Sequence, residues 1–318
     1  MLRSFYSGIS GLRNFQTKLD VVSNNIANVN TVGFKASRVM FQDVMSQTLQ
    51  GATAPQGTMG GVNPKQVGVG AGISSIDTKF INGSLMTTNY GTDFYIDGDG
   101  FFLVTGDGGE TLYLTRAGNF KLDAKGDLVD TRGMKVVGIE IRYNSTTGKF
   151  EPTTTPPTTI PNTDYSAINL GMIPNGTTVF TSDGTSSQTT ADLKIVDYAI
   201  GSDGTIEVLV ETGEKYILPY KIAMAVVQNP EGLLKVGNSL YQYTGNADTA
   251  ANIVDLITHP NDPTRGSGAI YSGFLEMSNV DLAEEFTEMI IAQRGFQANS
   301  RIITTSDEVL QELVNLKR

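Results

Sequence analysis

Apolar residues near the N-terminus recur in alternating steps of three and four. Such steps average about 3.5 residues, the period of helices that pair as a coiled coil. Polar Gln16 and Ser23 occupy the two positions that interrupt the series. The pattern therefore predicts an amphipathic helix whose apolar stripe consists of Leu2, Phe5, Ile9, Leu12, Leu19 and Ile26.

The C-terminal segment carries the same period for longer, with Gln293, Ser300 and Asp307 in its polar gaps. Ser278 followed by Asp281 predicts a capping box, so this helix should start near residue 279. One partner helix covers only one stripe, and this helix has two, so it needs more than one neighbour. The first stripe consists of Leu282, Phe286, Met289, Phe296, Ile303, Leu310 and Val314, and the second of Ile302, Val309, Leu313 and Leu316.

Two interpretations of the terminal stripes are open from the pattern alone. Each helix could pack on the protein's own globular core, or the two helices could pair with each other. The shared period and the second stripe favour pairing. Because burial in one seam only roughly offsets the cost of ordering the helices, we expect both to be largely unfolded in the free chain and to fold when neighbours cover the second stripe.

A polar segment, NNIANVNTVGFK at residues 24–35, directly follows the first helix. Asn tolerates left-handed backbone and bonds to nearby backbone groups, so it ends helices and builds tight turns. Gly33 permits such a turn, Phe34 anchors it, and Lys35 can meet acidic neighbours. The turn could be a plain surface connector or a packing element. Its candidate residues are Asn24, Asn25, Ile26, Ala27, Asn28, Gly33, Phe34 and Lys35.

The middle of the chain has the texture of short strands and turns. Segments such as DFYIDGDGFFLV alternate apolar residues around Asp-Gly turns, which is typical of hairpins. Residues 50–72 precede this strand-rich part of the chain and contain seven glycines without periodic apolar residues. This composition predicts a compliant linker. The Pro- and Thr-rich stretch within residues 146–194 predicts an insertion, either a small outer subdomain or an elaborated loop.

These patterns together predict an α+β fold, mainly β, in which a central β domain with a small insertion is flanked by N- and C-terminal helices that pair as a coiled coil. The expected divisions are an N-terminal helical segment with the Asn-rich turn at 1–49, the Gly-rich linker at 50–72, the β domain at 73–145 and 195–272, the insertion at 146–194, and the C-terminal helix at 273–318.

Composition narrows the function classes. The net charge of −10 argues against a nucleic-acid partner, because phosphate neutralisation needs clustered Lys and Arg. The absence of Cys removes disulfides and thiolate metal sites. No run approaches the roughly 18 apolar residues of a membrane span, so we expect no membrane insertion. Arg3 and Arg13 interrupt the N-terminal apolar residues, so we expect no cleaved signal peptide.

No constellation of catalytic or metal-binding residues emerges from the sequence. His259 is the single histidine and lies in the Pro- and Asp-rich segment ITHPNDP, without the partners that a metal site needs. Asp93, Asp97 and Asp99 do not form an EF-hand, since a count from Asp97 puts Gly108 at the twelfth, glutamate position. We therefore expect no enzyme activity, cofactor or metal.

Four ordered blocks resemble the bacterial flagellar rod and hook family. They are SGISGLRNFQTKLDVVSNNIANVNTVGFK; IDGDGFFLV with LTRAGNFKLDAKGDLV; GSDGTIEVLV with AMAVVQNPEGLLKVGNSLYQYTGNA; and the C-terminal SGFLEMSNVDLAEEFTEMIIAQRGFQANSRIITTSDEVLQELVNLKR. The last block is more similar to hook than to rod sequences. The insertion is shorter than the outer domain that hook sequences commonly carry.

The resemblance implies a structural subunit that polymerises with itself into a helical tube of the flagellum. Its partners would then be further copies of this chain, the rod, the hook cap, the hook–filament junction proteins and the type III export apparatus, and its place extracellular. A curved hook is the first expectation and a straight distal rod the alternative. A glycan-acting enzyme or an adhesin with coiled-coil tails would be a different class of protein.

Overall fold

The computed structural model describes residues 2–55, 60–106, 111–144, 149–152, 165–181, 186–189, 192–250 and 253–316. The chain divides into two compact units. We call the first the helical unit, which consists of Met1–Val29, Lys35–Lys79 and Val280–Arg318. The second, the β unit, consists of Asn30–Phe34 and Phe80–Asn279, so the chain passes between the units four times.

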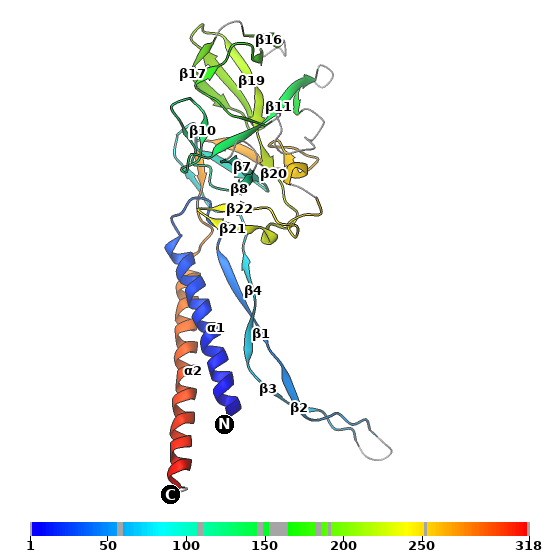
Figure 1. Ribbon diagram of the computed structural model, residues 1–318, viewed down its shortest axis with the longest axis vertical. Coiled ribbons are helices and arrows are strands. Elements are labelled where there is room, and N and C mark those ends of the chain that lie inside the picture. The colour runs from blue at the N-terminus through cyan, green and yellow to red at the C-terminus, as the bar shows by residue number, and fades with distance from the viewer. Residues whose placement is uncertain are drawn as a thin grey trace. The chain divides into compact units, whose positions relative to one another are not determined.

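Two long helices dominate the helical unit, α1 at Leu2–Ala27 and α2 at Leu282–Leu316. They lie side by side and run in opposite directions (Figure 1). Accordingly, Asn25 near the end of α1 donates a hydrogen bond to Glu285 near the start of α2. Asp281 caps α2, since its Oδ1 accepts the backbone N–H of Ala283 at 2.8 Å. The predicted start near residue 279 was therefore early by one turn, because Asp281 and not Ser278 provides the cap.

Two-stranded ribbons complete the helical unit. Strand β1 at Ser37–Asp43 pairs with β4 at Ala71–Thr78, and β2 at Ser46–Gln50 pairs with β3 at Lys65–Gly68, all antiparallel. The first ribbon packs on α1, where the rings of Phe15 and Phe41 lie 6.0 Å apart. Within the linker expected at residues 50–72, residues 65–68 pair with β2, and residues 71–72 belong to β4, which pairs with β1.

A closed barrel forms the centre of the β unit. Most of its neighbouring strands are antiparallel hairpin partners, as the alternating pattern predicts. Its strands are β7 Phe101–Thr105, β8 Leu112–Thr115, β9 Lys121–Leu122, β10 Leu128–Val129, β11 Lys135–Asn144, β12 Lys149–Pro152, β13 Tyr165–Ala167, β14 Met172–Ile173, β15 Thr178–Phe180, β16 Ser186–Gln188, β17 Leu193–Ile200, β18 Thr205–Val210, β19 Lys215–Ile222, β20 Met224–Ala225, β21 Leu234–Gly237, β22 Leu240–Gln242 and β23 Ile257–Thr258.

Smaller elements attach to the barrel. Two short 3-10 helices lie at Pro230–Gly232 and Ile253–Leu256. Strand β5 at Leu85–Thr87 pairs with β25 at Phe274–Glu276, and β6 at Phe94–Asp97 pairs with β24 at Ala269–Ser272. These two pairs join the early and late parts of the β unit, so residues about 180 apart in the chain lie next to each other.

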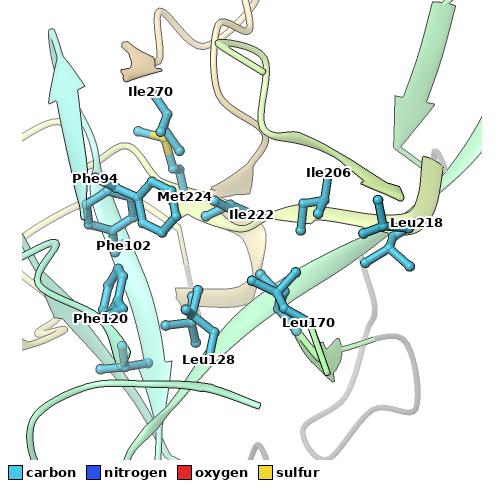
Figure 2. Close-up of a cluster of buried hydrophobic side chains, with 14 of the residues drawn as sticks. Phe94, Phe102, Phe120, Leu128, Leu170, Ile206, Leu218, Ile222, Met224 and Ile270 are labelled. Atoms are coloured by element: carbon cyan, nitrogen blue, oxygen red, sulfur yellow. The ribbon is translucent and has the colours of Figure 1, made fainter. Parts of the chain in front are cut away.

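The barrel encloses an aromatic and aliphatic core. Figure 2 shows Phe94, Phe102 and Phe120 packed together, and the rings of Phe102 and Phe120 meet edge to face at 5.4 Å. Met224 and Ile270 close the same cluster. A second cluster on the other side of β7 contains Phe101, Leu103, Leu114, Val137, Tyr241 and Val254, among others. The β unit therefore has a core of its own.

The insertion is part of the barrel. Strand β13 pairs with β11, β14 with β17, and β15 with β19, so the described strands of residues 146–194 extend the central sheet. Ile168, Leu170, Ile173 and Val179 lie in the main core cluster. Of the two possibilities that the sequence left, an elaboration of the β domain fits these residues, while 145–148, 153–164, 182–185 and 190–191 lie outside the described ranges.

The predicted fold class is confirmed: a mainly β structure carries one long helix at each end of the chain, and the two helices pair.

Candidate assembly site

The seam between α1 and α2 is made of small and polar residues. A Cβ placed on Gly11 would lie 2.6 Å from Asn299 Nδ2, and one placed on Gly295 would lie 2.5 Å from the Phe15 ring. Gly8 faces Ile303 in the same way, at 3.4 Å. Such glycines let two backbones approach closely, but they bury little apolar surface.

Within the described part of α2, the only buried residue is Ala292. The row of α2 that contacts α1 follows Glu285, Ala292, Gly295, Asn299 and Ile303. Of the predicted first stripe, only Met289 and Ile303 are partly buried, and the other members are exposed. The helices pair as expected, but through a different row, because small residues and not the apolar stripe allow the close approach.

The apolar residues of α2 lie on two flanks of this seam. With about 100° between successive residues, a helical wheel separates them into two groups on opposite sides of the contact row. All of them are exposed, by 38% to 83% of their surface. The first flank consists of Leu282, Phe286, Ile290, Phe296 and Val314, and the second flank of Ile291, Ile302, Val309, Leu313 and Leu316.

The end of α2 extends past the start of α1 (Figure 1). Gly8 lies opposite Ile303, so α1 begins opposite residue ~309 of the antiparallel helix. Leu310, at 38% exposure, would continue the seam but has no α1 residue to meet. The last two turns of α2 are therefore apolar on several sides and covered on none within the described helical unit.

The predicted stripe of α1 is half-buried. Phe5, Ile9, Leu12, Leu19 and Ile26 are all partly exposed, whereas Val22 and two asparagines of the same helix are buried. The side chain of Leu2 lies outside the described part of the chain. Because α1 is covered by α2 on one side and by the β1–β4 ribbon on another, its stripe is shared between the two contacts.

Asn25 joins three elements of the helical unit. Its side chain is 1% exposed, its Nδ2 donates to Ser37 O at 2.8 Å and to Glu285 Oε1 at 2.9 Å, and its Oδ1 accepts the Ser37 N–H at 3.0 Å. The end of α1, the start of β1 and the start of α2 therefore meet at one amide. This contact explains one asparagine of the predicted turn.

Charged groups surround this joint. Lys18 pairs with Glu288, and Lys79 Nζ lies 3.7 Å from Glu284 Oε1. Burial raises the pKa of Glu285 above its ordinary value, and the neighbouring Glu284 and Glu288 add to the shift, while the hydrogen bond from Asn25 opposes it. The Asn25 amide thus stabilises a carboxylate that its surroundings disfavour.

We expect Asn25→Ala to weaken the helical unit selectively. The substitution leaves the Ser37 backbone groups and a half-buried carboxylate without their partner, which costs roughly 1–3 kcal/mol. Thermal dissociation of the assembled polymer, in which we expect the helices to be folded, measures the effect through the helical circular dichroism signal. Asn24→Ala is the matched control, because Asn24 is exposed and only bonds within its own turn to Asn28; an equal loss in both variants would contradict this role of Asn25.

The turn that follows α1 is seated in the β unit. Gly33 has φ +66°, its N–H donates to Glu276 O at 2.8 Å, and a Cβ there would lie 2.6 Å from Ala117 N. Phe34 is buried at 7% exposure, with Lys235 Nζ 4.6 Å above its ring. Gly33 permits the geometry and Phe34 anchors the turn, as predicted, so this segment is a packing element and not a plain surface connector.

The asparagines of the turn bond to nearby backbone groups as predicted, but they do not adopt left-handed backbone. Of the described turn residues only Gly33 has a positive φ, so none of Asn24, Asn25 and Asn28 adopts left-handed backbone. Asn28 Nδ2 donates to Asn24 O at 2.9 Å, which satisfies a carbonyl at the end of α1. Lys35 is buried at 1% exposure, and Ala27 is exposed.

Sequence reasoning missed several residues of this region. Gly8, Gly11 and Gly295 weaken a helix by propensity, so their role in the seam gives no apolar signal. Arg116 and Ala117, which contact the turn, lie about 83 residues from it in the chain. The run RAGN at residues 116–119 predicts a turn between two strands, but nothing in its residue types indicates that it contacts Gly33.

Two kinds of feature are absent among the described residues: a cluster of metal-ligand side chains and a membrane-spanning helix. No three Asp, Glu or His side chains gather there closely enough to hold a metal ion. None of the helices in those ranges is both long and apolar enough to cross a membrane. His259 lies in a loop after β23, where its carbonyl accepts the Ser267 hydroxyl at 2.7 Å.

The two terminal helices pair with each other, and one of them leaves its apolar flanks uncovered, which is typical of a subunit that assembles with other proteins. Three family models match the chain in order. They describe a flagella basal body rod protein (residues 5–35), a flagellar hook protein FlgE/F/G D1 domain (95–208) and a flagellar basal body rod FlgEFG protein C-terminal region (271–316).

Relatives of both kinds are similar over the whole chain. The flagellar basal-body rod protein FlgG of Bacillus subtilis strain 168 is 46% identical over 319 residues, with all of both chains covered. The flagellar hook protein FlgE of Borreliella burgdorferi is 32% identical over 451 aligned residues, again with both chains covered. That of Helicobacter mustelae is 50% identical over 139 residues, which are 43% of this chain and 31% of that one.

The chain belongs to the flagellar basal-body rod and hook family, whose members are structural proteins and not enzymes. Members of this family polymerise into homopolymers within the basal body. A crystal structure of the Helicobacter pylori flagellar hook protein FlgE2 matches 60% of this chain and all of that one at 10% identity, with a TM-score of 0.38.

Proposed function

We propose that this chain is the repeating subunit of the flagellar hook, a curved tube that bends while it rotates and transmits torque from the rod to the filament. The uncovered flanks of α2 carry the proposal. Full burial of one such side chain contributes roughly 1.5–3 kcal/mol, so covering both flanks strongly favours assembly. Because the flanks face opposite sides of the seam, each needs a different neighbouring copy.

The charge distribution supports association through the helical unit. The β unit carries 23 acidic and 12 basic residues, whereas the helical unit carries 10 acidic and 11 basic residues. Copies that approach through their β units repel one another, and copies that approach through their nearly neutral helical units do not. We therefore place the predicted self-assembly residues of both terminal helices in the contacts between subunits, at the inner part of the tube.

Similarity to hook proteins supports the hook as one of the two candidates within the family. The segment shared with the Helicobacter mustelae hook protein is 50% identical. Two spirochaete hook proteins, from Borreliella burgdorferi and Treponema pallidum, match along the entire chain at 32% and 28% identity. The exposed β2–β3 hairpin gives each subunit an additional arm for contacts with other copies.

A distal rod subunit is the second candidate. The rod protein FlgG of Bacillus subtilis is 46% identical over the whole length, and that of Borreliella burgdorferi is 32% identical. A rod uses the same helical contacts but forms a straight and stiff tube. The two candidates therefore differ in the shape of the polymer and not in the nature of the subunit.

The proposed partners follow from the place of a hook. They are further copies of this chain, the rod below, the hook cap during growth and the hook–filament junction proteins above. The subunit would reach this extracellular place through the flagellar type III export apparatus. Terminal helices with little buried apolar surface suit such passage, because they unfold at low cost.

Electron microscopy of polymers assembled from the purified chain tests the proposal. We expect tubes, and we expect them to be curved and to change curvature along their length. Straight tubes would identify a rod subunit and reject the hook. A protein that stays monomeric at millimolar concentration and high salt, where charge repulsion is screened, would contradict both candidates.

A further inference from the structure

Three separate stretches of the β unit meet at one buried ion pair. Arg116 Nη1 lies 3.6 Å from Glu276 Oε2, and the two side chains are 4% and 1% exposed. The chain leaves or enters the β unit after residues 29, 34, 79 and 279. Glu276 lies three residues before the last of these points. The residues that bond to it, Gly33 and Gly83, lie within four residues of the other three.

Glu276 holds two of the passing segments. Its Oε1 accepts the backbone N–H of Gly83 at 2.9 Å, four residues after the chain enters the β unit. Its backbone carbonyl accepts the N–H of Gly33 at 2.8 Å, within the turn. A Cβ on Gly83 would lie 1.9 Å from Met277 O, so the backbone at Gly83 is in close contact with the backbone that follows Glu276.

Arg116 ties the same segments to the barrel. Its Nη1 donates to Asn82 Oδ1 at 3.4 Å and its Nη2 to Gly98 O at 2.8 Å. The guanidinium lies 5.3 Å from the ring centroid of Phe101 on β7. Burial lowers the pKa of Arg116, and Glu276 and Asp99 oppose the shift. A guanidinium keeps its proton in proteins, so the group is charged at neutral pH.

Net stability is not the obvious role of such a pair. A buried ion pair often contributes no more than well-packed apolar residues would, whereas its hydrogen bonds fix geometry and direction. Here the bonds involve Gly33, Gly83 and Glu276, each of which lies within four residues of a point where the chain passes between the units. Apolar side chains of similar size would fill the space without holding the Gly83 N–H and the Gly98 carbonyl.

We infer that Arg116 and Glu276 form a clip that fixes the points at which the chain enters and leaves the β unit. The β unit then moves as one body, and bending of the chain falls outside Gly33, Gly83 and Glu276. The clip deepens the proposed function, on which its use rests, because a tube that bends in rotation needs subunits made of rigid bodies. Its presence is a property of the single chain and is tested without polymers.

Hydrogen exchange measured by mass spectrometry on the full-length monomer tests the clip. In Arg116→Met/Glu276→Met, which removes both charges, we expect amide exchange to rise at least about tenfold in peptides that contain Gly33 and Gly83. Exchange in β7 at Phe101–Thr105 should stay as in the unchanged protein. The matched control is Lys194→Met/Glu211→Met, an exposed ion pair on the barrel, which should change neither.

Glu276→Gln provides a second variant that keeps an acceptor for the Gly83 N–H and removes one charge. We expect it to fold and to show a smaller rise confined to the same peptides. A uniform rise across the β unit would overturn the clip, because the pair would then only contribute to overall stability. Unchanged exchange at Gly33 and Gly83 would overturn it as well, and neither result depends on whether the polymers are hooks.

Discussion

Ile302→Glu/Leu313→Glu should abolish polymer formation while the monomer keeps its β unit. Both residues lie on the second flank of α2, at 43% and 47% exposure, so the monomer accepts a charge at either position. In the polymer the same positions would be covered by another copy. Losing two buried aliphatic side chains removes about 3–6 kcal/mol per contact, which raises the concentration needed for assembly by on the order of 100- to 10,000-fold.

The control adds the same charges to the polar side of the helix. Arg301→Glu/Thr305→Glu places two carboxylates at exposed positions between the two flanks, on the side of α2 away from α1, where we expect assembly to continue. Sedimentation of polymers at increasing protein concentration measures the shift for both pairs. Assembly of the flank variant at the concentration of the unchanged protein would show that the second flank is not a contact between copies.

Gly33→Ala should disrupt the seating of the turn that follows α1. The position has φ +66°, and the added Cβ would lie 2.6 Å from Ala117 N and 2.8 Å from Arg116 C. Both are backbone atoms, which cannot move aside as a flexible side chain would. The left-handed conformation costs about 1–2 kcal/mol and the overlap about 1–3 kcal/mol more, so we expect a loss of roughly 3 kcal/mol in the stability of the turn's contact.

Gly133→Ala separates the two contributions. Gly133 has φ +80°, but nothing lies within 4 Å of an added Cβ, so only the conformational term applies. Chemical denaturation with hydrogen exchange at peptides around residues 30–34 compares the two variants. Equal losses in both would mean that the close approach to Ala117 has no energetic consequence, and the turn would be only a connector.

The helices were predictable because the helical spacing of their apolar residues can be read from the sequence alone, whatever the helices pack against. Leu282, Phe286 and Phe296 repeat at helical spacing whether or not anything covers them. The row that forms the seam was not predictable, since Gly11 and Gly295 contribute through the absence of a side chain. A search for apolar periodicity gives glycine positions little weight as contact residues, although they decide how closely two backbones approach.

The turn was found from its residue types but its contacts were not. Gly33 and Phe34 predicted a tight turn held by a buried aromatic ring. In the structure Gly33 has a positive φ and Phe34 is buried. Asn25 finds its partner Glu285 260 residues away, and no local signal connects the two. The β2–β3 hairpin was missed for the opposite reason, because all of its strand residues are exposed and its glycines resemble those of a linker.

Weak intrinsic stability of the terminal helices is the central claim, and hydrogen exchange of residues 282–316 tests it most directly. The amides of α2 should exchange nearly as fast as in an unfolded chain when the protein is monomeric, because only Ala292 is buried among the described residues of this helix. In the assembled polymer we expect the same amides to exchange at least about a hundredfold more slowly. Strong protection of α2 in the monomer, unchanged on assembly, would contradict the account.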